Sequence, residues 1–107
     1  MLEESHANAA ADMAARALLE ARVDAARIIG ATESALAADA ALLDPDERAA
    51  LDATLGRLKR VLNDNAERRE LVEATEALNR ASEGFAGRRM DRSVAQALTG
   101  RSIDTLR

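Results

Sequence analysis

The chain contains a single proline, Pro45. Little in the sequence before this residue would end a long helix. The residues ahead of Pro45 contain one internal weak point, Gly30, which costs about 1 kcal/mol relative to alanine in a helix interior. About a quarter of the 107 residues are alanine, and the chain has one phenylalanine, no tyrosine and no tryptophan. Because alanine is the best helix former and β-branched residues are scarce, the sequence predicts an all-α fold.

The proline also marks the boundary between the first two predicted helices. The first is expected to run from about Glu3 to about Leu43. The second begins after the N-cap residue Asp44, with Pro45 at the first helical position and Glu47 completing a capping box. Two short connections then make three antiparallel neighbours, a three-helix bundle.

A short polar turn over residues 63–65 separates the second helix from the third. Asp64 or Asn65 is expected to cap the third helix, and Gly100 to end it, leaving residues 101–107 as a frayed tail. The sequence leaves open whether the first helix kinks at Gly30 and whether the third breaks near Gly87.

Apolar residues at spacings of three, four and seven predict which face of each helix is buried. Ala25, Thr32 and Ala40 fill the stripe of the first helix, and Thr75 lies on the inner face of the third. The three-helix bundle is predicted over residues 25–100. Its predicted core consists of these side chains: Ile29, Leu36, Leu43, Leu51, Leu55, Leu58, Leu62, Leu71, Leu78 and Phe85.

The helix lengths leave apolar residues without a partner. At 1.5 Å per residue the first helix would be about 60 Å long and the second about 26 Å, so residues 1–24 overhang. This overhang carries Met13, Leu18, Leu19 and Val23, which indicates a surface built to lie on something absent from the chain. Alternatively, an alanine-rich helix simply projects, stabilised by two ion pairs. These pairs would be Arg16 with Glu20 and Asp24 with Arg27.

The third helix also outruns its neighbours, after Phe85. Beyond that residue the apolar positions shift to a different phase of the helix, at Met90, Val94 and Leu98. We expect this second stripe to pack against the connection from Leu42 to Pro45, or against another copy of the chain.

Few residues offer catalytic or metal-binding chemistry. The chain has no cysteine, and its single histidine, His6, has no second histidine at helical spacing, so we expect it to be solvated. Apart from Ser5, which precedes His6, no serine has a histidine nearby in sequence, and no glycine-rich phosphate loop occurs. We therefore expect no catalytic, cofactor or metal site in these residues.

Charge and hydropathy exclude further classes of partner. The net charge of −4 argues against nonspecific nucleic-acid binding. No apolar run approaches the roughly 18 residues of a membrane-spanning helix, and the first ten residues lack the apolar stretch of a signal peptide, so a cytoplasmic protein is expected.

Three basic clusters interrupt the acidic background. Acidic residues, including Asp91, lie within a turn or two of each, so the clusters are expected to be solvated faces with local ion pairs, and partner docking by the third is the alternative. The clusters are Arg57, Lys59 and Arg60; Arg68 and Arg69; and Arg88, Arg89 and Arg92.

Three stretches in order, "ARALLEARVDAARI", "ALAADAALLDPDERAALD" and "FAGRRMDRSVAQAL", resemble a known family. They are similar to the C-terminal lid of the HscA branch of the DnaK-type, seventy-kilodalton heat-shock chaperones, which act in iron–sulfur cluster assembly. The resemblance covers nearly the whole chain, and the RRMD stretch distinguishes this branch from general DnaK.

The resemblance implies parts that these residues do not contain. It implies an ATPase domain that uses ATP and Mg²⁺, and a β-sandwich that binds an extended peptide. Residues 1–24 would lie over the sandwich, with Asp12, Met13, Leu18, Leu19 and Val23 in contact with it.

The resemblance also implies partners for the full-length protein, the iron–sulfur scaffold IscU and the J-domain cochaperone HscB. Ala26 and Gly30 stand at the positions of the family's latch pair, so any latch would need a different chemistry. A helical dimerisation or adaptor module without a chaperone role is the competing hypothesis, and it predicts a dimer through the first helix.

Overall fold

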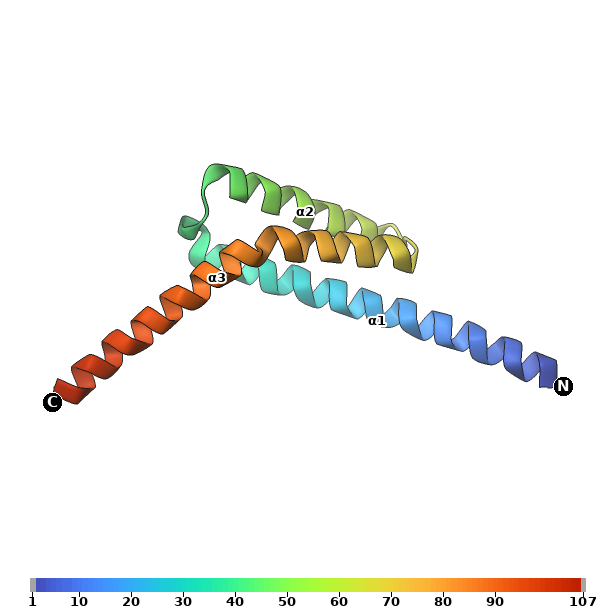
Figure 1. The fold of residues 1–107 in the computed structure, drawn as a ribbon. Coiled ribbons are helices and arrows are strands. Elements are labelled where there is room, and N and C mark those ends of the chain that lie inside the picture. The colour runs from blue at the N-terminus through green and yellow to red at the C-terminus, as the bar shows by residue number, and fades with distance from the viewer. Residues whose placement is uncertain (1, 107) are drawn as a thin grey trace.

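The chain folds into helices only, within the part that the structure describes. The computed structural model describes the backbone of residues 2–106 and the side-chain environments of residues 9–99. The predicted all-α fold is confirmed (Figure 1). The elements are α1 (Leu2–Asp39), a short 3₁₀ helix η1 (Ala40–Leu42), α2 (Pro45–Asn63) and α3 (Arg68–Leu106).

The molecule is long and thin because α2 is much shorter than its two neighbours. Its principal extents are 74 × 34 × 17 Å. In Figure 1, α2 and the first part of α3 lie along the C-terminal half of α1, and α1 and α3 overhang at opposite ends. The bundle is therefore confined to the middle of the molecule, as the helix lengths predicted.

α1 ends slightly earlier than the predicted Leu43. Its α-helical hydrogen bonding stops at Asp39, and the chain tightens into η1 before Leu43, whose backbone N–H donates to the carbonyl of Ala40 at 3.1 Å. Such a tightened last turn satisfies carbonyl groups that a helix end would leave unpaired. α1 is continuous through Gly30, where an added Cβ would meet nothing within 4 Å.

The predicted start of α2 is confirmed. The Asp44 carboxylate accepts a hydrogen bond from the Glu47 backbone N–H at 2.8 Å, and the Glu47 carboxylate accepts one from the Asp44 N–H at 3.2 Å. Pro45 occupies the first turn, where its missing N–H costs nothing.

The predicted cap of α3 is wrong, because the polar turn ends α2 instead. Asn65 has a positive φ of 54°, and the N–H of Ala66 donates to the carbonyl of Val61 at 3.4 Å. This is the six-to-one bond of a Schellman motif, in which asparagine tolerates the left-handed conformation. α3 begins only at Arg68, and the carbonyl of Glu67 accepts its first hydrogen bond, from Leu71.

The core runs along the contact of the three helices. Seven of the ten predicted side chains are buried, and Leu36, Leu43 and Leu62 are partly buried against them. Ala25 and Thr32 are also buried, and the Thr32 hydroxyl donates to the carbonyl of Ile28. Ala35 and Ala74 were missed because a buried alanine looks like any other in so alanine-rich a chain. The seven are Ile29, Leu51, Leu55, Leu58, Leu71, Leu78 and Phe85.

α3 is one continuous helix, and it does not end at Gly100. The helix runs through that residue to Leu106, so the predicted stop is wrong, whereas the fraying of residues 101–107 stays a prediction. Glycine costs a helix about 1 kcal/mol but does not end it without a cap motif. α3 does not break at Gly87 either. It changes direction in Figure 1 where its colour passes from gold to orange.

Candidate functional site

The candidate sites in the described part of the chain are exposed apolar and charged surfaces. Among residues whose side chains are described, no three histidine, cysteine or acidic side chains come together to hold a metal ion. His6 lies outside those residues, so the prediction of a solvated histidine concerns a side chain that the structure does not describe. No described helix is both long enough and apolar enough to cross a bilayer.

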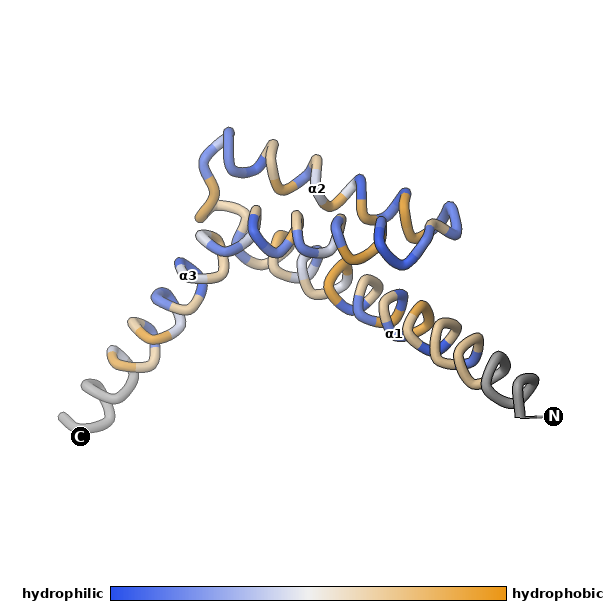
Figure 2. Tube along the Cα trace, turned by 45° about the vertical axis from the view of Figure 1, so that its right-hand side comes forward, coloured by the Kyte–Doolittle hydropathy of each residue, from blue (hydrophilic) through white to orange (hydrophobic). Residues whose placement is uncertain are grey.

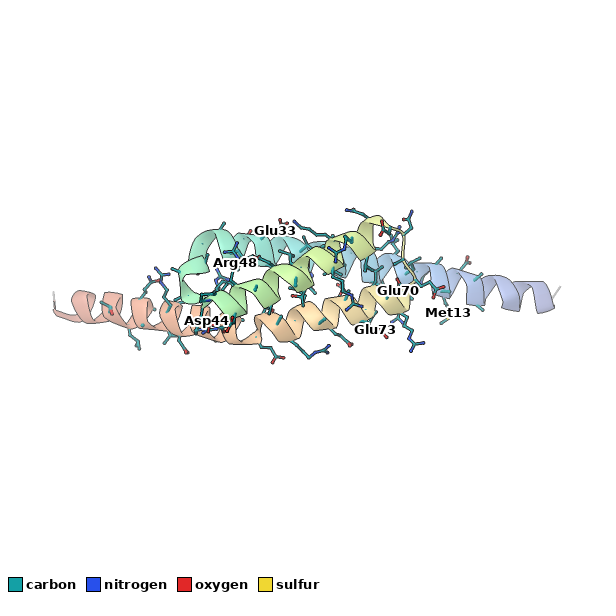
Figure 3. All side chains as sticks on the ribbon, turned by 90° about the horizontal axis from the view of Figure 1, so that it is seen from above. Met13, Glu33, Asp44, Arg48, Glu70 and Glu73 are labelled. Carbon is teal, nitrogen blue, oxygen red and sulfur yellow. The ribbon has the colours of Figure 1, made fainter. Side chains whose placement is uncertain are left out.

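The first candidate surface lies on α1. We call Met13, Leu19 and Val23 the α1 surface; their side chains are 70%, 62% and 59% exposed. Figure 2 colours much of the overhanging part of α1 as hydrophobic, and Figure 3 labels Met13 there. Asp12, also exposed, precedes Leu19 by seven residues and therefore lies on the same side of the helix.

Leu18 differs from the other predicted contact residues of α1. It is partly buried and packs against the bundle core, because it projects toward the side of α1 that carries Ala25 and Ile29. Arg22 also turns toward the bundle, and its guanidinium donates to the side-chain oxygen of Asn65 in the turn between α2 and α3. Packing within the chain thus reaches back to Leu18, before residue 25.

Of the two ion pairs predicted along α1, the structure contains one. Arg27 and Asp24 are 3.7 Å apart, with both side chains largely exposed. Arg16 and Glu20 form no ion pair in the part of α1 whose side chains are described. A single exposed pair contributes under about 1 kcal/mol, so the overhang gains little from it.

The second candidate surface lies on the C-terminal part of α3. We call Met90, Val94 and Leu98 the α3 stripe; they are 68%, 51% and 56% exposed. The prediction that they pack against the Leu42–Pro45 connection is wrong, because the side of α3 that faces this region carries arginines instead. Packing against another copy of the chain stays a prediction.

These arginines form what we call the arginine clasp. The Arg89 Nε donates to Asp39 Oδ2 at 2.8 Å, and the Arg92 Nη1 donates to Asp39 Oδ1 at 2.7 Å. Arg88 donates to the carboxylate of Glu47, the residue that also caps α2. The clasp therefore joins α3 to the end of α1 and to the start of α2 at once.

The prediction of local ion pairs is wrong for this cluster. The partners of Arg88, Arg89 and Arg92 lie 41 to 53 residues away in sequence. A usable signal existed, because the helix lengths place the region after Phe85 level with the acidic connection between α1 and α2. The guanidinium of Arg89 also lies 5.9 Å from the centre of the Phe85 ring, within cation–π range.

The other two basic clusters divide between local and long-range pairing. Arg69 pairs with Glu73 one turn away on α3, as predicted, at 3.4 Å. Lys59 instead reaches from α2 to Glu33 on α1 at 2.7 Å. Because the side chains of both pairs are about half exposed or more, each contributes under about 1 kcal/mol.

The clasp lowers the pKa of the Glu47 carboxyl below its ordinary value of 4.5. The hydrogen bond from Arg88 is the largest cause, and the backbone N–H of Asp44 is the next. The same contact raises the pKa of the Arg88 guanidinium. Both shifts favour the charged forms, so the pair is ionised at neutral pH.

A group whose pKa falls on folding stabilises the folded state above its unfolded pKa, and loses that contribution as pH falls through the folded value. We therefore expect Glu47→Gln to reduce the loss of stability below about pH 4.5, since glutamine can still cap α2 but cannot be protonated. Urea midpoints measured against pH test this. The control is Glu73→Gln, in an exposed pair on α3, and an acid limb unchanged by Glu47→Gln would contradict the assignment.

The chain is similar to several named proteins. No family model matches the chain. The chain is 50% identical over 108 residues to a chaperone protein HscA homolog of Verminephrobacter eiseniae, and 49% identical over 104 residues to that of Azoarcus sp.. A third HscA homolog, from Delftia acidovorans, is 49% identical over 107 residues. The alignments cover 97–99% of this chain.

The chain is similar, over nearly all of its own residues, to part of these HscA chaperone homologs. The chain spans about 17% of the length of these HscA relatives, so the helical bundle corresponds to one part of a much larger protein. The predicted HscA resemblance is thereby confirmed.

Proposed function

We propose that this chain is the C-terminal lid of an HscA-type, ATP-dependent chaperone that assists iron–sulfur cluster assembly. In this role the overhang of α1 lies across a β-sandwich and covers a peptide bound there. The observation that carries the proposal is the α1 surface, whose three apolar side chains have no cover within the described chain. The 50% identity to an HscA homolog over nearly the whole chain supports it.

The division of labour within the chain follows from its packing. Residues 1–24 would supply the contact with the sandwich, where Asp12 would approach the sandwich rim, and residues 25–100 would form a rigid bundle behind it. Leu18 would serve mainly the bundle, because it already packs against the core. Covering the peptide site would slow peptide release, and nucleotide binding elsewhere would bias open against closed states.

The remaining parts of the proposed function lie outside these residues. Hydrolysis of ATP with Mg²⁺ would take place in a separate ATPase domain, so the fragment itself would not be an enzyme. The scaffold IscU and the cochaperone HscB would be partners of the full-length protein in the cytoplasm. Since Ala26 and Gly30 are exposed and carry no polar side chain, closure would depend on apolar contact and not on a charged latch.

The decisive experiment measures peptide release from the full-length protein. Leu19→Asp together with Val23→Asp is expected to speed release roughly tenfold or more, because each buried Leu or Val contributes about 1.5–3 kcal/mol and 1.4 kcal/mol is a factor of ten. The matched control places the same charges on α3, by Val94→Asp and Leu98→Asp, and should leave release unchanged. Circular dichroism of the 107-residue chain carrying the same substitutions checks that each variant keeps its helices.

The competing function is a dimerisation or adaptor module. The same α1 surface favours it, because exposed apolar side chains also suit a helix-to-helix contact. Sedimentation of the 107-residue chain separates the two: a stable dimer abolished by Leu19→Asp, with release from the full-length protein unaffected, would support the adaptor and overturn the lid.

A further inference from the structure

The arginine clasp and the α3 stripe lie on opposite sides of one helix. Phe85, Arg89 and Arg92 follow each other at spacings of four and three, so they share one side of α3, and this side faces α1 and α2. Val94 follows Phe85 by nine residues, two and a half turns, and therefore lies on the far side. As long as the clasp is closed, the α3 stripe points away from the chain's own bundle.

The segment between the bundle and the clasp is suited to bending. The Ser82 hydroxyl donates to the backbone carbonyl of Asn79 at 3.1 Å, a contact that often accompanies a bend. Gly84 and Gly87 follow, and glycine is among the residues at which helices change direction. In Figure 1, α3 changes direction in this part of its course, while its helical hydrogen bonding continues to Leu106.

The ion pairs of the clasp are partly exposed to solvent. The side chains of Arg88, Arg89 and Arg92 are 41%, 39% and 48% exposed, so salt can screen their contacts. The Nε of Arg88 is buried without a hydrogen-bond partner among the described residues, which disfavours the closed arrangement. Three guanidinium groups share the carboxylates of Asp39 and Glu47, and the Asp44 carboxylate also lies near Arg88.

We propose that residues 88–106 form a hinged arm whose direction is set by the arginine clasp. The clasp holds the arm against the end of α1 and the start of α2, and the glycines at 84 and 87 provide the hinge. When salt or a competing anion weakens the clasp, the arm swings and the α3 stripe is aimed in a new direction. This device does not depend on the proposed lid function.

Spin-label distances in the 107-residue chain test the proposal. The chain has no cysteine, so Ala31→Cys on α1 and Ala95→Cys on the arm give one labelled pair. Ala31→Cys with Ala53→Cys on α2 gives a second pair inside the bundle. All three positions are exposed. We expect Asp39→Asn to shift and broaden the arm distance distribution while the bundle distribution stays unchanged.

Three further measurements keep the proposal open to refutation. Glu47→Gln preserves a capping residue and should broaden the arm distribution alone, whereas Arg69→Met, which removes an exposed pair elsewhere on α3, should not. High salt should act on the unsubstituted chain in the same way, because the Debye length falls to about 3 Å at 1 M. Gly84→Ala with Gly87→Ala should keep the arm distribution narrow even with Asp39→Asn, since an added Cβ at either position meets no closer contact than 3.4 Å.

The clasp would be overturned if the arm distance distribution did not change with Asp39→Asn, Glu47→Gln or high salt while the bundle distance distribution stayed intact. If the bundle distribution changed along with that of the arm, the contacts would stabilise the whole fold, and the hinged arm would likewise be rejected. Equal broadening with and without the two alanines would reject the glycine hinge.

Discussion

Replacing Leu58 with alanine is expected to lower the free energy of unfolding by about 2–5 kcal/mol. The Leu58 side chain is 0% exposed, and α2 has only 19 residues with which to hold its place in the bundle. Domains of this size are stable by roughly 5–15 kcal/mol, so the change removes a large share of the total. Each kilocalorie lowers the melting temperature by about 4–8 °C, which thermal unfolding followed by circular dichroism measures directly.

The matched control is Leu19→Ala, the same substitution on another helix of the same chain. Leu19 is 62% exposed, so alanine there leaves no cavity and is expected to change stability by no more than about 0.5 kcal/mol. Leucine and alanine have nearly the same helix propensity, so the two substitutions differ only in how deeply the leucine side chain is buried. Equal losses in the two variants would mean that the apolar face of α2 does not form the core.

The helices and the core were predictable because one physical signal determines both. A leucine at every third or fourth position can only be buried on one side of a helix, and Leu51, Leu55 and Leu58 are all buried. The capping box was predictable because the carboxylates of Asp44 and Glu47 each accept a hydrogen bond from the other's backbone N–H, three positions away in sequence. The error at Asn65 arose because asparagine suits both the start and the end of a helix, and only φ distinguishes them.

The surfaces were predictable from helix lengths, whereas the clasp was not predicted from charges. The overhanging parts of α1 and α3 follow from the lengths of the helices, and Leu19 and Met90 on them are exposed. Ion pairing depends on which residues meet in space, and the spacing of charges along the chain does not specify this. Leu18 illustrates the same limit, since one position along the helix decides whether an apolar residue belongs to the core or to the α1 surface.

Replacing Phe85 with alanine is expected to cost about 3–5 kcal/mol, as much as any single substitution in the chain. The ring is 3% exposed and is the last buried side chain of α3 before the arginine clasp. Its loss would empty the end of the core and remove the surface over which the Arg89 guanidinium lies. Chemical denaturation of the purified chain gives the change in unfolding free energy.

Phe85→Leu separates the two contributions of this ring. Leucine keeps most of the buried volume and should cost less than about 1.5 kcal/mol, mainly through the lost contact with Arg89. A further variant, Leu98→Ala, removes an apolar side chain from the exposed stripe and should be close to neutral. If Phe85→Ala were also neutral, the core would have to end before Phe85, and the change of apolar phase along α3 would need another cause. If Phe85→Leu cost as much as Phe85→Ala, the ring's contact with Arg89, and not its volume, would be what fixes α3 at this end of the bundle.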